Sequence, residues 1–534
     1  MASDLLFGSV PQFYREVYDI VCPDQQQVDR DMFVSLLVKS SLPKHVLTQI
    51  WDLVDTKVGY LTRNGLYKAL ALTALAQQGK PLNEKILETY TDQELPKPLL
   101  GDISDLKALS VKVRRDRNPN VLSYRYHELC ELDTIKVELV PEKKGLILKH
   151  VEYEVTSQRY KVTVLRRYND FLALHELLLQ RFPYRMVPRL PPKKMMGGIF
   201  TSVSREFIEH RRKALRRYIN LIARHPVMTD DRMLKFFLSF SGADMQYKIK
   251  EHFRGMPDEF MTNENALKAK DLVPMDTQLQ FGNTKEHIRI LHQSLTKVRD
   301  IADRMVARST EEANDMLYLG KELSSLSSDS TVLTSWATGA NNTWSQLKAG
   351  FKKICIEFAA ISDKSAEKAK REDELVSEVV NILLDLVVAY RDLCERHEKG
   401  VLNDHQRALQ KMGQYKKKKM SATVGSTESA AVEQLEQRIL QQESQISNME
   451  NRNYFSLHCL QMEAQLIHAN LDILYTILQN IANIQSKSYT ELGHAWCHLL
   501  PIVEAILPRM NGSDATSPTS SPPLSPKHAG GITV

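Results

Sequence analysis

The stretch Arg166–Phe171 (Arg-Arg-Tyr-Asn-Asp-Phe) follows a run of residues that alternates between polar and apolar side chains, as a β-strand does. Two arginines stand beside a tyrosine where that alternation ends. Guanidinium groups offer forked donors to phosphate oxygens, and a tyrosine ring offers a flat face to a sugar-like ring. We therefore expect the end of this strand to hold one planar, polyanionic ligand.

The residues around this stretch predict a small domain of three strands and several helices. Alternation predicts the antiparallel strands, and apolar residues at helical spacing predict the helices. Proline excludes a helix from the segment between the two helices. The expected elements are strands 134–140, 147–155 and 160–164, helices 170–181 and 205–225, and an extended loop at 188–193.

This order resembles the PX domain, a phosphoinositide-binding module, over residues 131–242. The resemblance implies that phosphatidylinositol 3-phosphate is the ligand. It also implies roles for four residues: Arg167 binds the 3-phosphate, Tyr168 stacks on the inositol ring, Lys193 contacts the 1-phosphate and Arg211 binds the 4- and 5-hydroxyls.

Other basic residues of this domain have simpler expected roles. Arg212, Arg216 and Arg217 are expected on a solvated or membrane-proximal helix face. In an alternative interpretation, Arg166 and Arg167 form a surface ion pair with Asp170. Residues 101–240 hold 28 Lys and Arg against 16 Asp and Glu, in a chain whose net charge is +6. This excess suggests an anionic partner for the region.

A loop that inserts into the membrane is expected directly after Lys194. Its apolar residues flank two glycines beside the expected phosphate site, and they are Met195, Met196, Ile199 and Phe200. Each apolar side chain placed in lipid contributes on the order of 1–3 kcal/mol. The alternative is a loop folded back onto its own domain.

The N-terminal segment, residues 1–95, predicts two helix–loop–helix units. Its stretch SSLPKHVLTQIWDLVD (residues 40–55) resembles the EH domain, an EF-hand pair that binds Asn-Pro-Phe peptides. The resemblance places a peptide pocket at Trp51, with Leu47 one turn earlier and Leu37 on the preceding helix. The alternative is that all three are core residues of a small helical domain.

Calcium is not expected in this EF-hand pair. A calcium loop needs side-chain oxygens at its first, third and fifth positions and a glutamate at its twelfth. Here Asp55 is followed by Lys57 and Val58, and Gly65 stands where the glutamate belongs. We therefore expect degenerate metal sites, and no metal or cofactor anywhere in the chain.

The C-terminal half predicts three long helices with coiled-coil seams, at 282–325, 331–419 and 430–508. Such helices after a PX-like domain resemble the BAR region of sorting nexins, in which two chains pair into a curved rod. The resemblance implies a homodimer whose lysines contact curved anionic membrane, namely Lys348, Lys352, Lys353, Lys416, Lys417, Lys418 and Lys419. The alternative is a plain coiled coil with solvated charges.

Composition and motifs exclude several classes of protein. Hydrophobic content of 43% and charged content of 25% are ordinary for globular domains. The six cysteines stand singly, so they indicate neither a disulfide framework nor a zinc site. The sequence contains no run of about 18 apolar residues, so we expect no segment that spans a membrane. We find none of the common catalytic motifs and expect neither an enzyme nor a nucleic-acid-binding protein.

The expected fold is multidomain and mainly α: an EF-hand-like N-terminal domain, an α+β domain with a three-stranded antiparallel sheet, and a three-helix rod. Linkers are expected at 96–130 and at 243–281, the latter with an amphipathic helix near 247–253, and a disordered tail at 511–534.

As a whole the chain resembles sorting nexins of the PX-BAR class. This resemblance implies a peripheral protein on the cytosolic face of early endosomes that sorts cargo towards the Golgi. The alternative is a lipid-anchored scaffold for signalling proteins that does not bend membrane.

Overall fold

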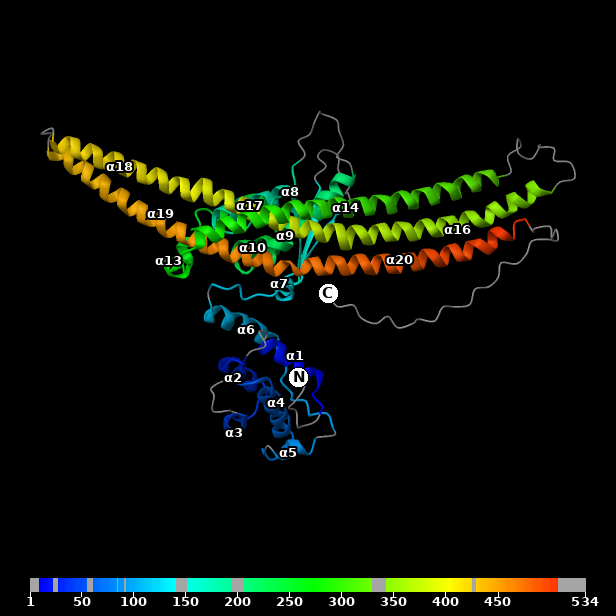
Figure 1. The fold of residues 1–534 in the computed structure, drawn as a ribbon, viewed down its shortest axis with the longest axis horizontal. Coiled ribbons are helices and arrows are strands. Elements are labelled where there is room, and N and C mark those ends of the chain that lie inside the picture. The colour runs from blue at the N-terminus through cyan, green and yellow to red at the C-terminus, as the bar shows by residue number, and fades with distance from the viewer. Residues whose placement is uncertain are drawn as a thin grey trace, which may run out of the picture. The chain divides into compact units, whose positions relative to one another are not determined.

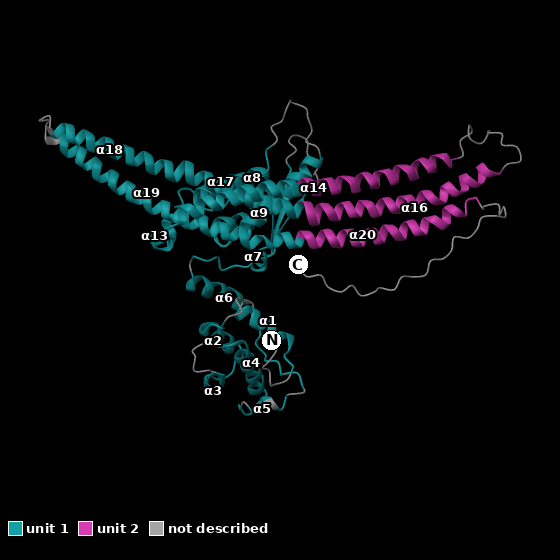
Figure 2. Cartoon of the chain, viewed as in Figure 1, with its two compact units in different colours: residues 1–299, 378–476 teal, residues 300–377, 477–534 magenta. Residues whose placement is uncertain are grey.

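The computed structural model describes residues 9–22, 27–54, 61–83, 85–90, 93–118, 120–140, 151–193, 205–328, 342–424 and 429–507. The chain divides into two compact units (Figure 2). The first unit holds residues 1–299 and 378–476, and the second holds residues 300–377 and 477–534. Within the described residues, no helix combines the length and apolar character needed to cross a bilayer.

The first unit begins with a helical domain in which two helices start at side-chain caps. The Asp29 side chain accepts hydrogen bonds from the backbone of Asp31 and Met32, and Thr62 caps the fourth helix. A backbone bridge between Val28 and Leu61 joins the two expected helix–loop–helix halves. The helices are α1 Gln12–Val21, α2 Arg30–Val38, α3 Lys44–Val54, α4 Arg63–Gln77, α5 Lys85–Glu88 and α6 Ser104–Arg117.

The segment expected as a linker after residue 95 is partly structured. Helix α6 packs against α1 and α2, and its Leu106 is buried in the same core as Leu95 and Leu100. Helix α7, Tyr126–Leu132, precedes the sheet. Apolar residues beyond the expected boundary therefore complete the N-terminal core.

The sheet has three antiparallel strands in the order β1-β2-β3: β1 Ile135–Leu139, β2 Glu152–Ser157 and β3 Val162–Arg167. The last two strands end later than the sequence predicts, because the turn between them lies at residues 158–161, where Lys161 has a φ of 53°. Strand β3 thus runs on to Arg167, and its buried residues alternate with exposed ones.

Three helices pack against the sheet: α8 Tyr168–Arg181, α9 Arg205–Ala223 and α10 Arg232–Ser239. A further helix, α11 Met245–His252, packs on α8 and α10. Helix α11 occupies the expected amphipathic segment. Its Met245 and Ile249 are buried in the core of the sheet domain, and the helix packs on α8. The apolar residues of the expected amphipathic helix are therefore used inside the domain, and this part of the expected linker belongs to its core.

The rod part of the first unit contains α17 Glu378–Arg396, a π-helical turn η2 His397–Leu402, α18 Asn403–Val424 and α19 Ser429–Asn470. Helices α18 and α19 lie side by side (Figure 1). The short helices α12 Glu259–Thr262 and α13 Ala269–Leu272 follow the sheet domain, and α13 packs on α19.

In its described residues, the second unit is a bundle of three helical stretches (Figure 2). They come from α14 Thr277–Leu326, from α16 Thr343–Glu372 with the π-helical turn η1 Asp373–Ser377, and from α20 Asp472–Glu504. Their core includes Ile354, Phe358 and Leu492. A Cβ atom at Gly320 would lie 3.1 Å from the Cys355 carbonyl oxygen, so the glycine permits α14 and α16 to approach closely.

The three expected long helices are confirmed, with two differences. The second runs through consecutive helical segments from Thr343 to Val424 and contains two π-helical turns that periodicity does not predict. The third is interrupted at Leu471, whose backbone N–H bonds to the carbonyl of His468 three residues earlier.

Candidate functional site

The candidate site lies where strand β3 passes directly into helix α8. Arg167 is the last residue of β3, and its backbone N–H donates to the Asp170 carboxylate at 2.7 Å. Its guanidinium donates to Glu152 on β2 at 2.9 Å and 2.7 Å. The Arg167 side chain remains 54% exposed. The expected alternative, an ion pair between this guanidinium and Asp170, is not formed here.

Tyr168 and Arg211 lie against each other in this site. The Arg211 guanidinium carbon is 5.5 Å from the Tyr168 ring centroid, and Arg211 Nε donates to the Tyr153 hydroxyl at 2.8 Å. The Tyr168 hydroxyl donates to the Pro191 carbonyl at 2.6 Å. Burial raises the pKa of Tyr168 although Arg211 opposes the rise, so the phenol stays neutral.

The proline-rich loop brings a third basic group, Lys193, to the same place. Lys193 Nζ donates to the Asn169 side chain at 3.3 Å, next to Tyr168 in α8. Arg167, Tyr168, Lys193 and Arg211 are thus gathered from β3, α8, the loop and α9. Met195, Met196, Ile199 and Phe200 lie outside the described residues.

Arg166 does not belong to this exposed group, contrary to our expectation for the arginine pair. It is 2% exposed, and its guanidinium donates to the carbonyls of Phe237 (2.9 Å and 2.5 Å), Phe240 (2.6 Å) and Leu165 (2.7 Å). Burial lowers the pKa of Arg166 to about 10, so it stays charged at neutral pH. Strand alternation places Arg166 on the core face with Val164, and this signal was available in the sequence.

Arg217 also has a different role from the expected solvated one. It is 9% exposed and donates to Asp385 and Glu378 of α17, both at 2.8 Å. Arg189 pairs with Asp392, which lies one heptad further along α17. Part of the basic excess of the sheet domain therefore faces acidic residues of the rod helix.

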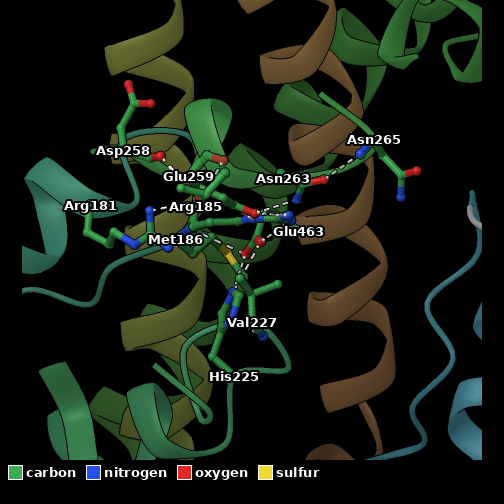
Figure 3. Close-up of polar contacts among 11 residues, drawn as sticks. Arg181, Arg185, Met186, His225, Val227, Asp258, Glu259, Asn263, Asn265 and Glu463 are labelled. Atoms are coloured by element: carbon green, nitrogen blue, oxygen red, sulfur yellow. Dashed lines mark hydrogen bonds and ion pairs between the residues drawn. The ribbon is translucent and has the colours of Figure 1, made fainter. Parts of the chain in front are cut away.

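A second set of contacts joins the sheet domain to α19. Arg185 pairs with Glu259 at 2.7 Å and with Glu463 at 3.2 Å, and His225 contacts Glu463 at 3.1 Å (Figure 3). All four side chains are at most 7% exposed. The pKa of Glu463 is lowered, because His225 and Arg185 outweigh the opposing effect of burial. Sequence reasoning missed this cluster, whose members lie up to 278 residues apart.

The expected peptide pocket of the N-terminal domain is partly formed by accessible residues. Leu47 and Trp51 are half-buried, and the Trp51 ring lies 5.3 Å from that of Phe33. The Arg30 guanidinium carbon lies 5.4 Å from the Trp51 ring centroid. Leu37 is 3% exposed and packs in the core, so it offers a peptide little surface. Residues 55–60, in the loop where we expect no calcium, lie outside the described residues.

The expected membrane lysines fall in two places. Lys352 and Lys353 are exposed in the first part of α16, and Lys348 is half-buried one turn earlier. The group Lys416–Lys419 lies near the end of α18, where Lys416 pairs with Glu443 (3.3 Å) and Lys419 with Glu436 (2.7 Å) of α19. Lys417 and Lys418 are exposed.

The sequence matches three known domain families. They are the EH domain at residues 11–100, the PX domain at residues 154–241 and the sorting nexin 8/Mvp1 BAR domain at residues 255–506. The EF-hand-like domain, the sheet domain and the rod described above correspond to these three matches.

Whole-chain comparisons agree. The chain is 49% identical to human sorting nexin-8 over 413 residues, which cover 77% of this chain and 86% of the relative. It is 27% identical to sorting nexin MVP1 of Kluyveromyces lactis over 353 residues, 64% and 67% of the two chains. Its fold is similar to the cryo-EM structure of the SNX-BAR Mvp1 tetramer, with a TM-score of 0.53 and 22% identity over 68% of this chain and 99% of that one.

PX and BAR domains are membrane-binding modules, and proteins that combine them bind membrane, respond to its curvature and act in trafficking. The domain matches and the identity to sorting nexin-8 lead to one conclusion. The chain belongs to the sorting nexin family, in the class that joins a PX domain to a BAR domain.

Proposed function

We propose that this chain is a peripheral protein of early endosomes that binds phosphatidylinositol 3-phosphate through its PX domain and curved membrane through a BAR dimer. The observation that carries the proposal is the gathering of Arg167, Tyr168, Lys193 and Arg211 around the end of β3. These are the four residue types, in the order, that the PX resemblance assigns to the headgroup.

The geometry at Arg167 favours an exchange of partners. Its present partner, Glu152, is partly exposed, and an exposed ion pair contributes about 1 kcal/mol or less. A phosphate can replace that carboxylate on the same guanidinium fork at little cost. Tyr168 would present its ring to the inositol, and Arg211 beside it would donate to the hydroxyls.

The second unit supports dimerisation. Its helix α20 leaves a row of apolar side chains exposed along one face, spaced by seven, four and three residues: Tyr489, Trp496, Leu500 and Val503. Such a row is typical of a helix that packs against a partner. We propose that a second copy of the chain covers it, which would give the membrane a rod with paired basic regions.

The proposed cellular role is cargo sorting from early endosomes towards the Golgi. The N-terminal EH domain would recruit a partner, such as an Asn-Pro-Phe peptide, beside Trp51 and Leu47. The alternative is a lipid-anchored scaffold that recruits signalling proteins without bending membrane.

Vesicle flotation and electron microscopy test this proposal. The full chain should bind vesicles that contain phosphatidylinositol 3-phosphate, and Arg167→Ala should lose that binding. Arg232→Ala is the matched control, because Arg232 is exposed on the first turn of α10 and carries the same charge. Tubules formed by the wild type support the BAR role, and binding without tubules supports the scaffold. Binding that ignores the lipid or Arg167 contradicts the PX assignment.

A further inference from the structure

The contacts between the PX domain and the rod centre on one buried carboxylate. Glu463 of α19 accepts a hydrogen bond from Arg185 Nη1 at 3.2 Å and one from the backbone N–H of Met186 at 3.3 Å. Both of its oxygens lie 3.1 Å from His225 Nε2 (Figure 3). A single rod side chain therefore binds two separate segments of the PX domain, one after α8 and one after α9.

The proton on His225 can be assigned from its neighbours. The backbone N–H of Val227 donates to His225 Nδ1 at 3.2 Å, so Nδ1 is an acceptor and carries no proton. The remaining proton is on Nε2, which donates to Glu463. The imidazole is thus held in one orientation, with Nε2 directed at the carboxylate.

Arg185 connects this carboxylate to the segment that leaves the PX domain. Its Nε and Nη2 atoms donate to Glu259 of α12, at distances from 2.7 to 3.2 Å. The backbone carbonyl of Arg185 accepts from Arg396 of α17 at 2.7 Å. Arg185 therefore contacts the connecting segment at α12 and two rod helices, α17 and α19.

Breaking such a cluster has a different consequence from breaking a surface pair. Exposed ion pairs contribute little, whereas removal of one partner from a buried pair leaves an uncompensated charge and is strongly destabilising. Buried ionic groups are poor sources of stability, and their best-attested use is to specify one arrangement of the elements that they join. The burial of Glu463, at 2% side-chain exposure, fits that use.

We propose that Glu463 is a positioning residue, which fixes the orientation of the PX domain on the rod by holding Arg185, Met186 and His225 together. This inference rests on the proposed lipid binding. With that orientation fixed, the headgroup site and the rod engage one membrane at the same time, and the two weak contacts reinforce each other. Without it, the two parts remain tethered but lose their common geometry.

The test uses the full chain with Glu463→Gln, which keeps the side-chain size and removes the charge. Glu450→Gln is the control, because Glu450 is exposed on the same helix. We expect Glu463→Gln to bind soluble inositol 1,3-bisphosphate as the wild type does. Its affinity for small vesicles that contain phosphatidylinositol 3-phosphate should fall about tenfold, since the tethered sites lose their fixed geometry, and its preference for small over large vesicles should weaken.

Hydrogen exchange provides a readout that is independent of lipid. Backbone amides of residues 185–187 and 225–227 should exchange faster in Glu463→Gln than in the control, while those of the sheet stay protected. If Glu463→Gln fails to fold, Asp392→Asn replaces it. That change removes the pairing of Arg189, whose side chain is 59% exposed, on the same interface, and it should weaken the preference for small vesicles in the same direction.

Two results would separate the possible failures. Unchanged exchange and unchanged vesicle preference in Glu463→Gln would overturn the positioning role while the lipid function stands. A wild type that binds neither the soluble headgroup nor the vesicles would overturn the proposed function instead, and the exchange data would still decide whether Glu463 fixes the PX domain.

Discussion

The two neighbouring arginines at the end of β3 should respond in opposite ways to the same substitution. Methionine at either position keeps much of the aliphatic volume and removes the guanidinium donors. At Arg166 these donors serve the carbonyls of Phe237 and Phe240, at the C-terminal end of α10. At Arg167 the donors serve Glu152, and an anionic ligand can take its place.

The magnitude follows from what each change leaves unpaired. Arg166→Met removes the donor to three carbonyls, two of them at the end of α10, on Phe237 and Phe240. Each buried carbonyl left unpaired costs about 1–3 kcal/mol. The substitution also removes a cation–π contact of about 1 kcal/mol with the Phe237 ring, whose centroid lies 5.2 Å away. Relief of the buried charge offsets part of this loss. We therefore expect a net destabilisation of about 2–4 kcal/mol, against about 1 kcal/mol or less for Arg167→Met.

Urea unfolding of the full chain, with hydrogen exchange followed on peptides from β3 and α10, measures these differences. Arg166→Met should lower the unfolding midpoint of the PX domain and the protection of residues 236–240. Arg167→Met should keep both and lose binding to vesicles with phosphatidylinositol 3-phosphate. Wild-type protection of α10 in Arg166→Met, or equal destabilisation by both changes, would refute the assigned division of roles.

Three further predictions concern the lipid site, the response to pH and the dimer. Glu152→Gln should raise the affinity for the lipid about two- to fivefold in flotation, because it removes a carboxylate that competes for Arg167. Glu154→Gln is the control, since Glu154 is exposed two residues along the same strand, and it should leave the affinity unchanged. Equal effects of the two changes would show that net charge alone is responsible. Burial lowers the pKa of His397 and of His458 to about 4. Because each histidine takes up a proton more readily in the unfolded chain, the free energy of unfolding should fall by up to about 3 kcal/mol for each residue as the pH drops from 6.5 towards 4. Urea unfolding at pH 7 and pH 5 should show the loss, and His397→Gln should reduce it; a wild type equally stable at both values contradicts the assignment. Leu500→Lys should shift the chain from dimer to monomer in sedimentation. If the variant remains a dimer, the dimer interface lies on another face.

Local patterns predicted the strands of the sheet and the three rod helices, since alternation and helical spacing repeat within a few residues. The roles of Arg167, Tyr168, Lys193 and Arg211 came from the resemblance to the PX domain, not from periodicity. The boundaries of β2 and β3 were displaced because a turn at 158–161 could not be located by alternation alone.

Tertiary structure decided which charges face solvent and which are buried. Arg166 and Arg167 are the same residue type in adjacent positions, yet one caps the end of α10 and the other is open to a ligand. The partners of Arg217 on α17, and the partner of Arg185 on α19, lie more than 150 residues away in the sequence.

The physical reason is that an arginine carries the same charge and the same five donors wherever it stands. Its role depends on whether packing brings a carboxylate to it and removes water from both. Periodicity, by itself, determined the faces of the strands and helices of this protein. Only the packing of PX domain against rod determined that Glu463 would be buried between them.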